Sequence, residues 1–345
     1  MISIIIPVSN NENTIAECIN SVLLQNYNKY EIILVLNNSK DKTKSIIKKK
    51  FLKKKIKFFI IKKIGPSAAR NYGIRKSKMK YILFLDADDL LIPGCLSYLS
   101  SLIRKKNVNA LYNSHAQLGN NYYNLKKKFD GIKTSRFFYT KQIKNYLVKF
   151  SLKPNIFSAF VHCWGNLYNR EFLLKNKIFF DESLGNLEDV IFNINVFKKL
   201  KKLYYDNKFK YVHRVNSTSG RQSFKINKNN VHSILTTEKN LNYFLKDTLK
   251  NKKNILKHYV TWNIINLLIR LSKSKINFVS LKNFINELYK SETIKESFNH
   301  YILFKEYNKF FIYFLKYRLK KSLYLYVFFY SLYNKFINTI RKIWQ

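Results

Sequence analysis

The chain begins with a regular alternation of short apolar runs and segments whose apolar residues recur with the helical period. The apolar runs, each predicted to be a β-strand, are residues 2–6, 31–36, 57–61, 81–85 and 108–112. The segments between them, each predicted to be a helix, are residues 12–25, 41–55, 67–77 and a fourth that Pro93 opens. Continuously apolar strands that alternate with helices indicate an α/β fold with a mostly parallel sheet and helices on both faces. Ligands of such sheets bind beyond the carboxyl ends of the strands.

Three aspartates, Asp86, Asp88 and Asp89, follow directly after the fourth apolar run. The whole chain has only 20 acidic side chains against 64 basic ones, so this crowding is unusual. Carboxylates at alternate positions can converge on Mg²⁺ or Mn²⁺, which prefer oxygen ligands. The alternative is a turn or helix N-cap, where one aspartate is common but three in four positions are not. A dehalogenase-type phosphatase motif, D-x-D-x-T/V, is disfavoured because its fifth position is Leu90 and four strands precede it.

Four further polar segments can contribute to a site together with these aspartates. The loop and helix start GPSAARNYG at 65–73 offers backbone N–H groups for phosphate, and Arg70 offers a bidentate cation; the alternative is an ordinary loop–helix junction. The stretches 4–10 and 34–41 end the first two strands at the same edge of the sheet, where they can hold a base. Glu188 and Asp189 lie together at a predicted helix start, where the helix dipole alone also favours acids.

The net charge of +44 suggests an anionic partner, although a lysine-rich composition typical of an AT-rich genome explains much of it equally well. The lysine runs at 48–50, 53–55 and 126–128 lack a recognisable nucleic-acid-binding module around them, so no nucleic acid partner is expected. Cys18, Cys95 and Cys163 are far apart, which argues against a disulfide framework and a zinc site and for a reducing compartment.

The lack of a recognisable signal peptide, together with the C-terminal pattern, favours a cytoplasmic protein that lies on a membrane. The N-terminus shows no signal-peptide pattern, and the uncharged aromatic run 322–334 is too short to span a bilayer. Residues 305–345 are basic and aromatic, and a helical projection puts lysines on one face and apolar residues on the other: Lys305, Lys309, Lys316 and Lys320 against Phe311, Phe314, Leu315 and Tyr317. Such a helix can lie in an anionic membrane interface, or it can pack its apolar face on a protein core.

Taken in order, these segments resemble the motifs of a family-2 glycosyltransferase with the GT-A fold. The first strand ends in Pro7, Val8, Ser9 and Asn10 where the family has I-P-x-Y-N, and 35–41 stands where it has V-D-D-G-S-x-D. The other matches are the G-x-x-x-A-R-N-x-G loop at 65–73, the D-x-D of Asp86, Ala87 and Asp88, the W-x-x-L-Y segment at 164–168, the E-D-x-x-F segment at 188–192, and Tyr211 to Arg214 followed by Ser217. The resemblance covers about residues 1–220.

The chain departs from the family pattern at two positions of the base site. The aspartate that usually binds the uracil edge is Asn37, whose amide can still accept from a base N–H and donate to a carbonyl. The aromatic residue usual before Asn10 is Ser9, so a stacking surface for the base is missing. The resemblance therefore implies recognition of uridine, but by an altered set of contacts.

The resemblance implies an inverting transfer of a sugar from a nucleotide-diphosphate sugar, expected to be a UDP-sugar, to an acceptor hydroxyl, with Mn²⁺ or Mg²⁺ as cofactor. Asp88 would hold the metal, and Asp86 would bind the ribose or assist the metal. The base would lie against Asn37 and the 7–10 backbone. Arg70 and Arg214 would lie at the diphosphate, with His213 beside Arg214 and only secondarily as a metal ligand. Trp164 would line the acceptor cleft or pack in the core. Asp189 would be the catalytic base, with Glu188 as the alternative.

The same resemblance implies a catalytic domain over 1–225, with a nucleotide-binding half (1–112) and an acceptor half (113–225), followed by a basic helical region over 226–345. The acceptor is expected to be a glycan or glycolipid of a bacterial surface polysaccharide, such as lipooligosaccharide or capsule, at the inner face of the cytoplasmic membrane. A nucleotidyltransferase is the alternative enzyme, but its Gly- and Lys-rich loop is absent from 9–14. A non-catalytic basic protein that binds membranes or nucleic acid is the third alternative.

Overall fold

The structure is a computed structural model of the chain and describes residues 1–51, 56–63, 65–118, 125–127, 130–214, 228–249, 254–272, 278–301, 309–323 and 325–327. Ser217, Lys305, the expected domain boundary at 225 and much of the 305–345 tail lie outside these residues. The chain divides into two compact units. The first comprises Met1–Leu147, Asn155–Glu182 and Glu188–Ser223, and the second comprises Val148–Pro154, Ser183–Leu187 and Phe224–Gln345.

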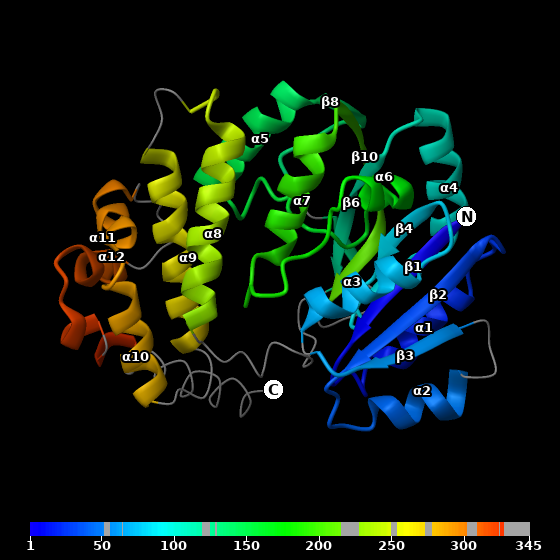
Figure 1. Cartoon of the computed structure of the whole chain (residues 1–345), viewed down its shortest axis with the longest axis horizontal. Helices are drawn as coiled ribbons and strands as arrows, with labels where there is room; N and C mark the ends of the chain where they lie inside the picture. Colours follow the sequence, from blue (N-terminus) through cyan, green and yellow to red (C-terminus); the bar gives the residue numbers. More distant parts are fainter. Residues whose placement is uncertain are drawn as a thin grey trace. The chain divides into compact units, whose positions relative to one another are not determined.

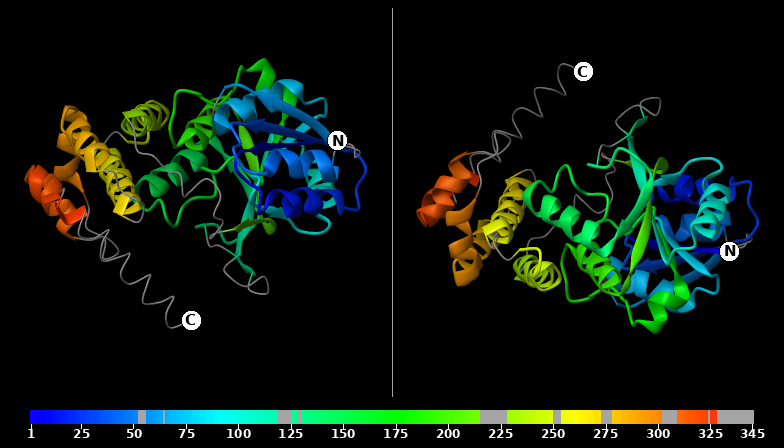
Figure 2. Two further views of the ribbon diagram at one scale, coloured as in Figure 1. Left: turned by 90° about the horizontal axis from the view of Figure 1, so that it is seen from below. Right: turned by 90° about the horizontal axis from the view of Figure 1, so that it is seen from above.

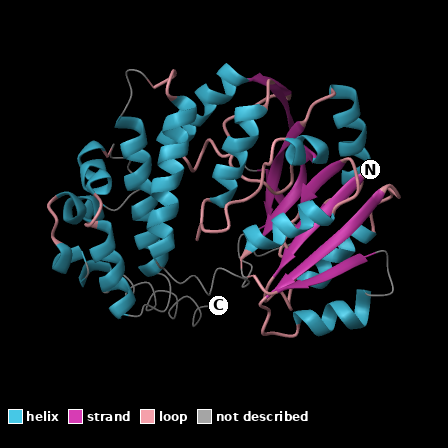
Figure 3. Ribbon diagram, viewed as in Figure 1, coloured by secondary structure: helices cyan, strands magenta, loops and turns pink. Residues whose placement is uncertain are grey.

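The first unit contains all strands of the described part and the helices around them (Figure 1; Figure 3). Its strands are β1 (Ile2–Val8), β2 (Tyr30–Asn37), β3 (Ile56–Ile61), β4 (Tyr81–Phe84), β5 (Leu90–Leu91), β6 (Ala110–Leu118), β7 (Leu125–Lys127), β8 (Arg136–Tyr139), β9 (Leu167–Asn169) and β10 (Lys202–Arg214). Its helices are α1 (Ile15–Leu23), α2 (Thr43–Phe51), α3 (Pro66–Lys76), α4 (Cys95–Lys106), α6 (Arg170–Lys175) and α7 (Glu188–Lys199). Helix α5 (Thr140–Leu152) begins in this unit and ends in the second.

The sheet has the strand order β3-β2-β1-β4-β9-β6-β10-β5. Strands β3, β2, β1 and β4 run parallel, as the apolar runs predict. The short strand β9 then pairs antiparallel with both β4 and β6, and β10 runs parallel to β6. The carboxyl ends of β1, β2, β4, β6 and β10 therefore meet at one edge, which is where ligands of such sheets bind.

Helices cover both faces of this sheet (Figure 2). On one face, apolar residues of α1, α2 and α4 form a continuous core with alternate residues of β1 and β2. On the other face α3 packs closely on β1, because Gly73 has no side chain: a Cβ there would lie 2.3 Å from Cγ2 of Ile5. The second glycine of the 65–73 motif thus holds α3, which carries Arg70, against the sheet.

Two predicted element boundaries are wrong. Pro93 does not open a helix, because α4 begins at Cys95 after Gly94, whose φ of 72° is left-handed and interrupts the helical backbone. The fifth strand does not end at Tyr112 but continues to Leu118 as β6. Its polar residues Asn113 and His115 are buried there, and the Asn113 backbone and side chain bond Asn166 and Gly165, which stabilises the longer strand.

The described part of the second unit is helical. Its helices are α8 (Lys228–Leu245), α9 (Asn254–Ser272), α10 (Phe278–Leu288), α11 (Glu292–Ser297), the 3₁₀ turn η1 (Phe298–His300) and α12 (Lys309–Lys316). They bury a core of their own, in which Ile264, Leu288 and Phe311 are almost fully inaccessible. None of the helices in the described ranges is long and apolar enough to cross a membrane.

Candidate active site

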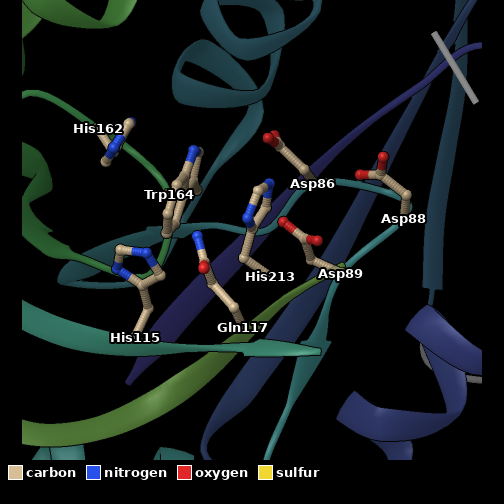
Figure 4. Close-up of a pocket in the computed structure, with 8 residues that line it drawn as sticks. All are labelled: Asp86, Asp88, Asp89, His115, Gln117, His162, Trp164 and His213. Atoms are coloured by element: carbon tan, nitrogen blue, oxygen red, sulfur yellow. The ribbon is translucent and has the colours of Figure 1, made fainter. Parts of the chain in front are cut away.

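A cavity of about 250 Å³ opens at the carboxyl edge of the first unit's sheet. Figure 4 shows its lining: the three aspartates on one side and a group of aromatic and amide side chains facing them. The lining residues are Asp86, Asp88, Asp89, His115, Gln117, His162, Trp164 and His213. The aspartates follow β4, the next two residues come from β6, His162 and Trp164 precede β9, and His213 comes from β10.

The three aspartates of this cavity have different surroundings. Asp89 is buried, and its two oxygens accept hydrogen bonds from the Tyr211 hydroxyl at 2.5 Å and the Arg214 backbone N–H at 2.8 Å. Burial, reinforced by the charges of Asp88 and Asp86, raises the pKa of Asp89 well above its usual range. Asp86 accepts from Arg70 at 2.9 Å, and burial raises the pKa of Asp86 despite this cation. The carboxylate of Asp89 is thus used in structural hydrogen bonds, while Asp86 and Asp88 are partly exposed toward the cavity.

Arg70 joins the first aspartate to the acidic start of α7. Its guanidinium contacts Asp86 at 2.9 Å, Glu188 at 3.1 Å and Asp189 at 3.2 Å, and its side chain is only 5% exposed. One buried cation therefore neutralises part of the charge of three carboxylates that would otherwise repel one another. The structure brings together residues that are 118 and 119 positions apart in the sequence.

Asp189 is also attached to the wall of the cavity. Its Oδ2 accepts from the backbone N–H of Cys163 at 3.3 Å, and Cys163 lies between His162 and Trp164, which line the cavity. Each carboxylate oxygen has a second lone pair, so these contacts leave Asp189 able to accept a proton. Burial raises the pKa of Asp189 to about 6, although Arg70 acts to lower it. A carboxylate with a pKa near 6 suits a general base at neutral pH.

Buried packing fixes the start of α7. Asn193 Oδ1 accepts hydrogen bonds from Tyr112 of β6 at 2.6 Å and from Tyr168 of β9 at 2.9 Å. The preceding residue, Phe192, stacks on Phe180 with ring centroids 4.1 Å apart. These buried contacts hold the first turn of α7, and hence its two acids, in one orientation toward Arg70.

The carboxylates of the cavity suit a hard divalent cation. Asp86 and Asp88 offer oxygen donors on the same wall, and Mg²⁺ or Mn²⁺ commonly takes one or two carboxylates together with waters and substrate phosphates. Within the described ranges no three His, Cys, Asp or Glu side chains are arranged as a complete metal cage. Asp86 and Asp88 are the carboxylates of the cavity that could take part in binding a metal together with a phosphate ligand.

Of the residues predicted for the site, Asp86, Asp88, Asp89, Trp164 and His213 line the cavity, and the others do not. Ser9 and Asn10 belong to the loop after β1, which hydrogen-bonds the loop after β2. Asn10 N–H donates to the Ser39 hydroxyl, and Asn10 Oδ1 accepts from Lys40 N–H. The other predicted donor-site residues that lie outside the lining are Pro7, Val8, Asn37, Arg70, Ala87 and Arg214, and the candidate bases Glu188 and Asp189 lie outside it as well.

Three of these residues have contacts that bear on their predicted roles. The Asn37 amide nitrogen donates to the Gly65 carbonyl at 2.6 Å, which links the end of β2 to the start of α3. The Arg214 guanidinium pairs with Glu17, and its backbone N–H binds Asp89. The Ala87 carbonyl accepts from the Thr14 hydroxyl at 3.0 Å, which fixes the turn between the two cavity aspartates.

Trp164 lies in a stack of aromatic rings. His162 stacks on it with centroids 4.5 Å apart, Tyr211 at 4.8 Å and His213 at 5.3 Å, while His115 meets it edge-on at 4.8 Å. The indole faces are thus used in packing against the neighbouring rings. Trp164 shapes the cavity wall, and the imidazoles around it supply much of the polar surface opposite the aspartates (Figure 4).

Sequence reasoning missed His115, Gln117 and His162. The first two have a recognisable signal, because Asn113, His115 and Gln117 alternate with other residues and therefore point to one side of β6. This period of two follows the predicted strand 108–112, which lacks the same alternation, so it is recognisable only once 113–118 is known to extend the strand. No comparable signal marks His162, which lies in a loop.

Known proteins with similar sequences decide the family. The family model described as "Glycosyl transferase family 2" matches residues 3–173, which include the 65–73 loop, the three aspartates and Trp164. The chain belongs to this family. An uncharacterized glycosyltransferase of Rickettsia bellii is 36% identical over 117 residues, 34% of this chain and 17% of that protein. A poly(ribitol-phosphate) beta-glucosyltransferase of Bacillus spizizenii is 32% identical over 225 residues, 62% of this chain and 32% of that protein.

Solved structures confirm the fold. S. aureus TarS, residues 1–349, crystallised with UDP-GlcNAc, matches with a TM-score of 0.61 over 95% of this family-2 chain and 90% of that one, at 16% identity. The GT-A fold expected for a family-2 glycosyltransferase is thus the fold observed. Against the two sequence relatives, in contrast, the aligned region spans less than a third of each relative's length.

Proposed function

We propose that the chain is an inverting glycosyltransferase that moves a hexose or N-acetylhexosamine from a UDP-sugar to a hydroxyl of a glycan acceptor. One observation carries this proposal: Arg70 connects Asp86, on the cavity wall, to Asp189 and Glu188 at the start of α7. The carboxylates proposed to bind a metal–diphosphate and the candidate base for the acceptor hydroxyl are thereby linked through one side chain. Inverting transfer requires both of these groups within reach of one sugar.

The donor diphosphate would occupy the aspartate side of the cavity. Asp88 would hold Mn²⁺ or Mg²⁺, with Asp86 assisting it or binding the ribose. When bound, the metal would stabilise the negative charge that develops on the leaving diphosphate. Arg70 would hold Asp86 in place and, through its remaining donor capacity, favour negative charge nearby. Asn37 and the 7–10 backbone would bind the base, and Arg214 would lie at the diphosphate.

Asp189 would accept the proton of the attacking acceptor hydroxyl. Its attachment to Cys163 places it beside the Trp164 wall, and its raised pKa near 6 leaves it ionised at pH 7 yet basic enough to take a proton. Glu188 also contacts Arg70, whereas Asp189 in addition accepts a hydrogen bond from the Cys163 N–H. Asp189 is therefore the first candidate and Glu188 the second.

The acceptor is proposed to be a glycan or glycolipid of a surface polymer, with the enzyme in the cytoplasm at the inner face of the membrane. Two relatives support a polymer acceptor and a uridine donor: one is named a poly(ribitol-phosphate) beta-glucosyltransferase, and TarS was crystallised with UDP-GlcNAc. Lipooligosaccharide, capsule and teichoic-acid-type polymers are the acceptor classes that fit. Trp164 and the imidazoles around it would form the acceptor side of the cavity.

A panel of nucleotide sugars tests the donor. In the presence of Mn²⁺, one or more UDP-sugars are expected to raise the melting temperature of the protein and to be hydrolysed slowly to UDP, because a bound ligand stabilises the folded state. GDP- and CDP-sugars serve as matched controls, and a chelator should abolish the effect. Stabilisation by GDP-sugars alone would move the base assignment away from uridine.

The pH dependence of transfer tests the catalytic base. Because Asp189 must be ionised to accept a proton, kcat/KM is expected to be constant above about pH 7 and to fall about tenfold per unit below its pKa of about 6. Residual turnover by Asp189→Asn should lack this acidic limb. A limb near the ordinary aspartate pKa of about 4 would contradict the proposed environment of Asp189.

A further inference from the structure

Helix α12 presents aromatic side chains on two sides. Phe311 and Leu315 are fully buried in the core of the second unit. Phe310, Tyr313 and Tyr317 point the other way and are 60%, 52% and 57% exposed. Packing of an amphipathic helix on a core therefore accounts for Phe311 but leaves these three exposed rings unexplained.

This arrangement corrects the predicted faces of the helix. Phe311 and Leu315 are buried as expected and Phe314 is half-buried, but Tyr317 is exposed beside the lysines rather than opposite them. The chain leaves the helix at this point, and Arg318 has a left-handed φ of 56°. The side chain of Lys309 lies outside the described residues.

The three exposed rings form a continuous row with the half-buried Phe314, which lies between Phe310 and Tyr313. Tyr313 lies 4.8 Å from Tyr317, and Phe314 lies 5.9 Å from Tyr313 and 6.3 Å from Phe310, measured between ring centroids. Scattered exposed apolar residues need no explanation, whereas a contiguous row of large rings indicates an interaction surface.

Cations border this row, and acids are absent from it. Lys316 lies over the Tyr317 ring at 5.8 Å, and Arg318, Lys320 and Lys321 are also exposed within the next few residues. The sequence from 307 to 345 contains no Asp or Glu. Large apolar rings next to lysines, whose long stems let the charge reach past an apolar layer, are the composition of segments that lie in a membrane interface.

We propose that Phe310, Tyr313, Lys316 and Tyr317, together with the exposed cations at 318–321, bind the surface of an anionic phospholipid membrane. The rings would enter the boundary between headgroups and acyl chains, and the cations would contact lipid phosphates. The charge pattern selects this occupant over a second copy of the chain, because two copies would bring like-charged cations together. A membrane also accounts for the exposed rings. The backbone of a soluble phosphate polymer would contact the cations but leave the rings in water.

This inference extends the proposed function, since it names the surface that would keep the enzyme beside a glycolipid acceptor. Its test needs neither donor nor acceptor, so it can fail while the proposed transfer holds, and the reverse. The full chain is sedimented with vesicles of phosphatidylcholine alone and of phosphatidylcholine mixed with phosphatidylglycerol. Binding only to the anionic vesicles is expected.

Charge-removing variants test the cations. The double variant Lys316→Gln and Lys320→Gln should lower the partition coefficient between water and anionic vesicles by about fivefold for each lysine. Each basic residue near an anionic surface raises membrane binding by about that factor. Lys48→Gln with Lys49→Gln removes the same charge from exposed positions of α2 and is the matched control. Equal losses in both pairs would show that net charge alone causes binding and would overturn the proposal.

Ring-removing variants test the apolar contact. Phe310→Ser, Tyr313→Ser and Tyr317→Ser combined should lower the partition coefficient by about tenfold or more, whereas Tyr139→Ser with Tyr243→Ser, at exposed positions elsewhere, should not change it. Unchanged binding by the triple variant would overturn the proposal. So would a wild-type dimer, measured by sedimentation without lipid, that the triple variant dissociates. If the triple variant fails to fold, the lysine pair still decides.

Discussion

Replacing Asp189 with asparagine is expected to lower kcat of sugar transfer by about 10³-fold, within the range known for loss of a general base. The amide of asparagine cannot take the proton of the acceptor hydroxyl. Its oxygen can still accept from the Cys163 N–H or from Arg70, so the first turn of α7 should keep its place. The affinity for UDP, which does not depend on proton transfer, should stay within about twofold of the wild type.

Single-turnover transfer with an identified donor measures this loss, and calorimetry with UDP measures the affinity. Glu188→Gln is the matched control, because it also removes one carboxylate that contacts Arg70 at a similar distance. Its effect is expected to be about tenfold or less. If the loss is instead large for Glu188→Gln and small for Asp189→Asn, the role of base passes to Glu188.

Replacing Asp88 with alanine is the second large effect. Loss of this carboxylate is expected to lower transfer by about 10³-fold and to abolish the response to Mn²⁺, because charge on the leaving diphosphate would no longer be stabilised at that position. Unlike Asp89, which receives hydrogen bonds from Tyr211 and Arg214, Asp88 is partly exposed toward the cavity. Its replacement should therefore change the melting temperature of the free protein little.

The control for Asp88→Ala is Glu171→Ala, which removes an exposed carboxylate of α6 outside the cavity lining. This variant should keep wild-type transfer and wild-type dependence on Mn²⁺. Normal turnover of donor by Asp88→Ala with Mn²⁺ present would refute the metal role of Asp88.

The parallel half of the fold is predictable because its information is local. Continuous apolar runs define β1 to β4, and the rule that ligands bind at the carboxyl ends of parallel strands places Asp86 and Asp88 correctly at the edge of the sheet. Strand β9 is not predictable in this way. It has three residues, and its antiparallel insertion between β4 and β6 depends on pairings with distant segments.

The contacts of Arg70 could not be predicted from the sequence for the same reason. Its motif indicates a cation near a diphosphate, whereas the structure pairs it with Asp86, Glu188 and Asp189. That grouping depends on how α7 packs, which the buried Asn193 and the Phe192–Phe180 stack decide. Motif order was sufficient to expect both acids in the site, but not the cation that connects them.

The tail shows a similar limit. Helical periodicity assigns Phe311 and Leu315 to a buried face, and the structure agrees. A projection of one continuous helix cannot show that α12 ends at Lys316, and so it places Tyr317 on the wrong side. The local backbone after the helix, rather than the apolar pattern, leaves that ring exposed.

Calorimetric titration of UDP into the full chain, with and without Mn²⁺, tests the central claim most directly. A transferase that uses Asp88 and Asp86 to bind a metal–diphosphate should bind UDP at least about tenfold more tightly with Mn²⁺ present, and Asp88→Ala should remove this difference. Equal affinity for UDP with and without the metal, or no binding of UDP at all beside salt-sensitive binding of duplex DNA, would contradict it.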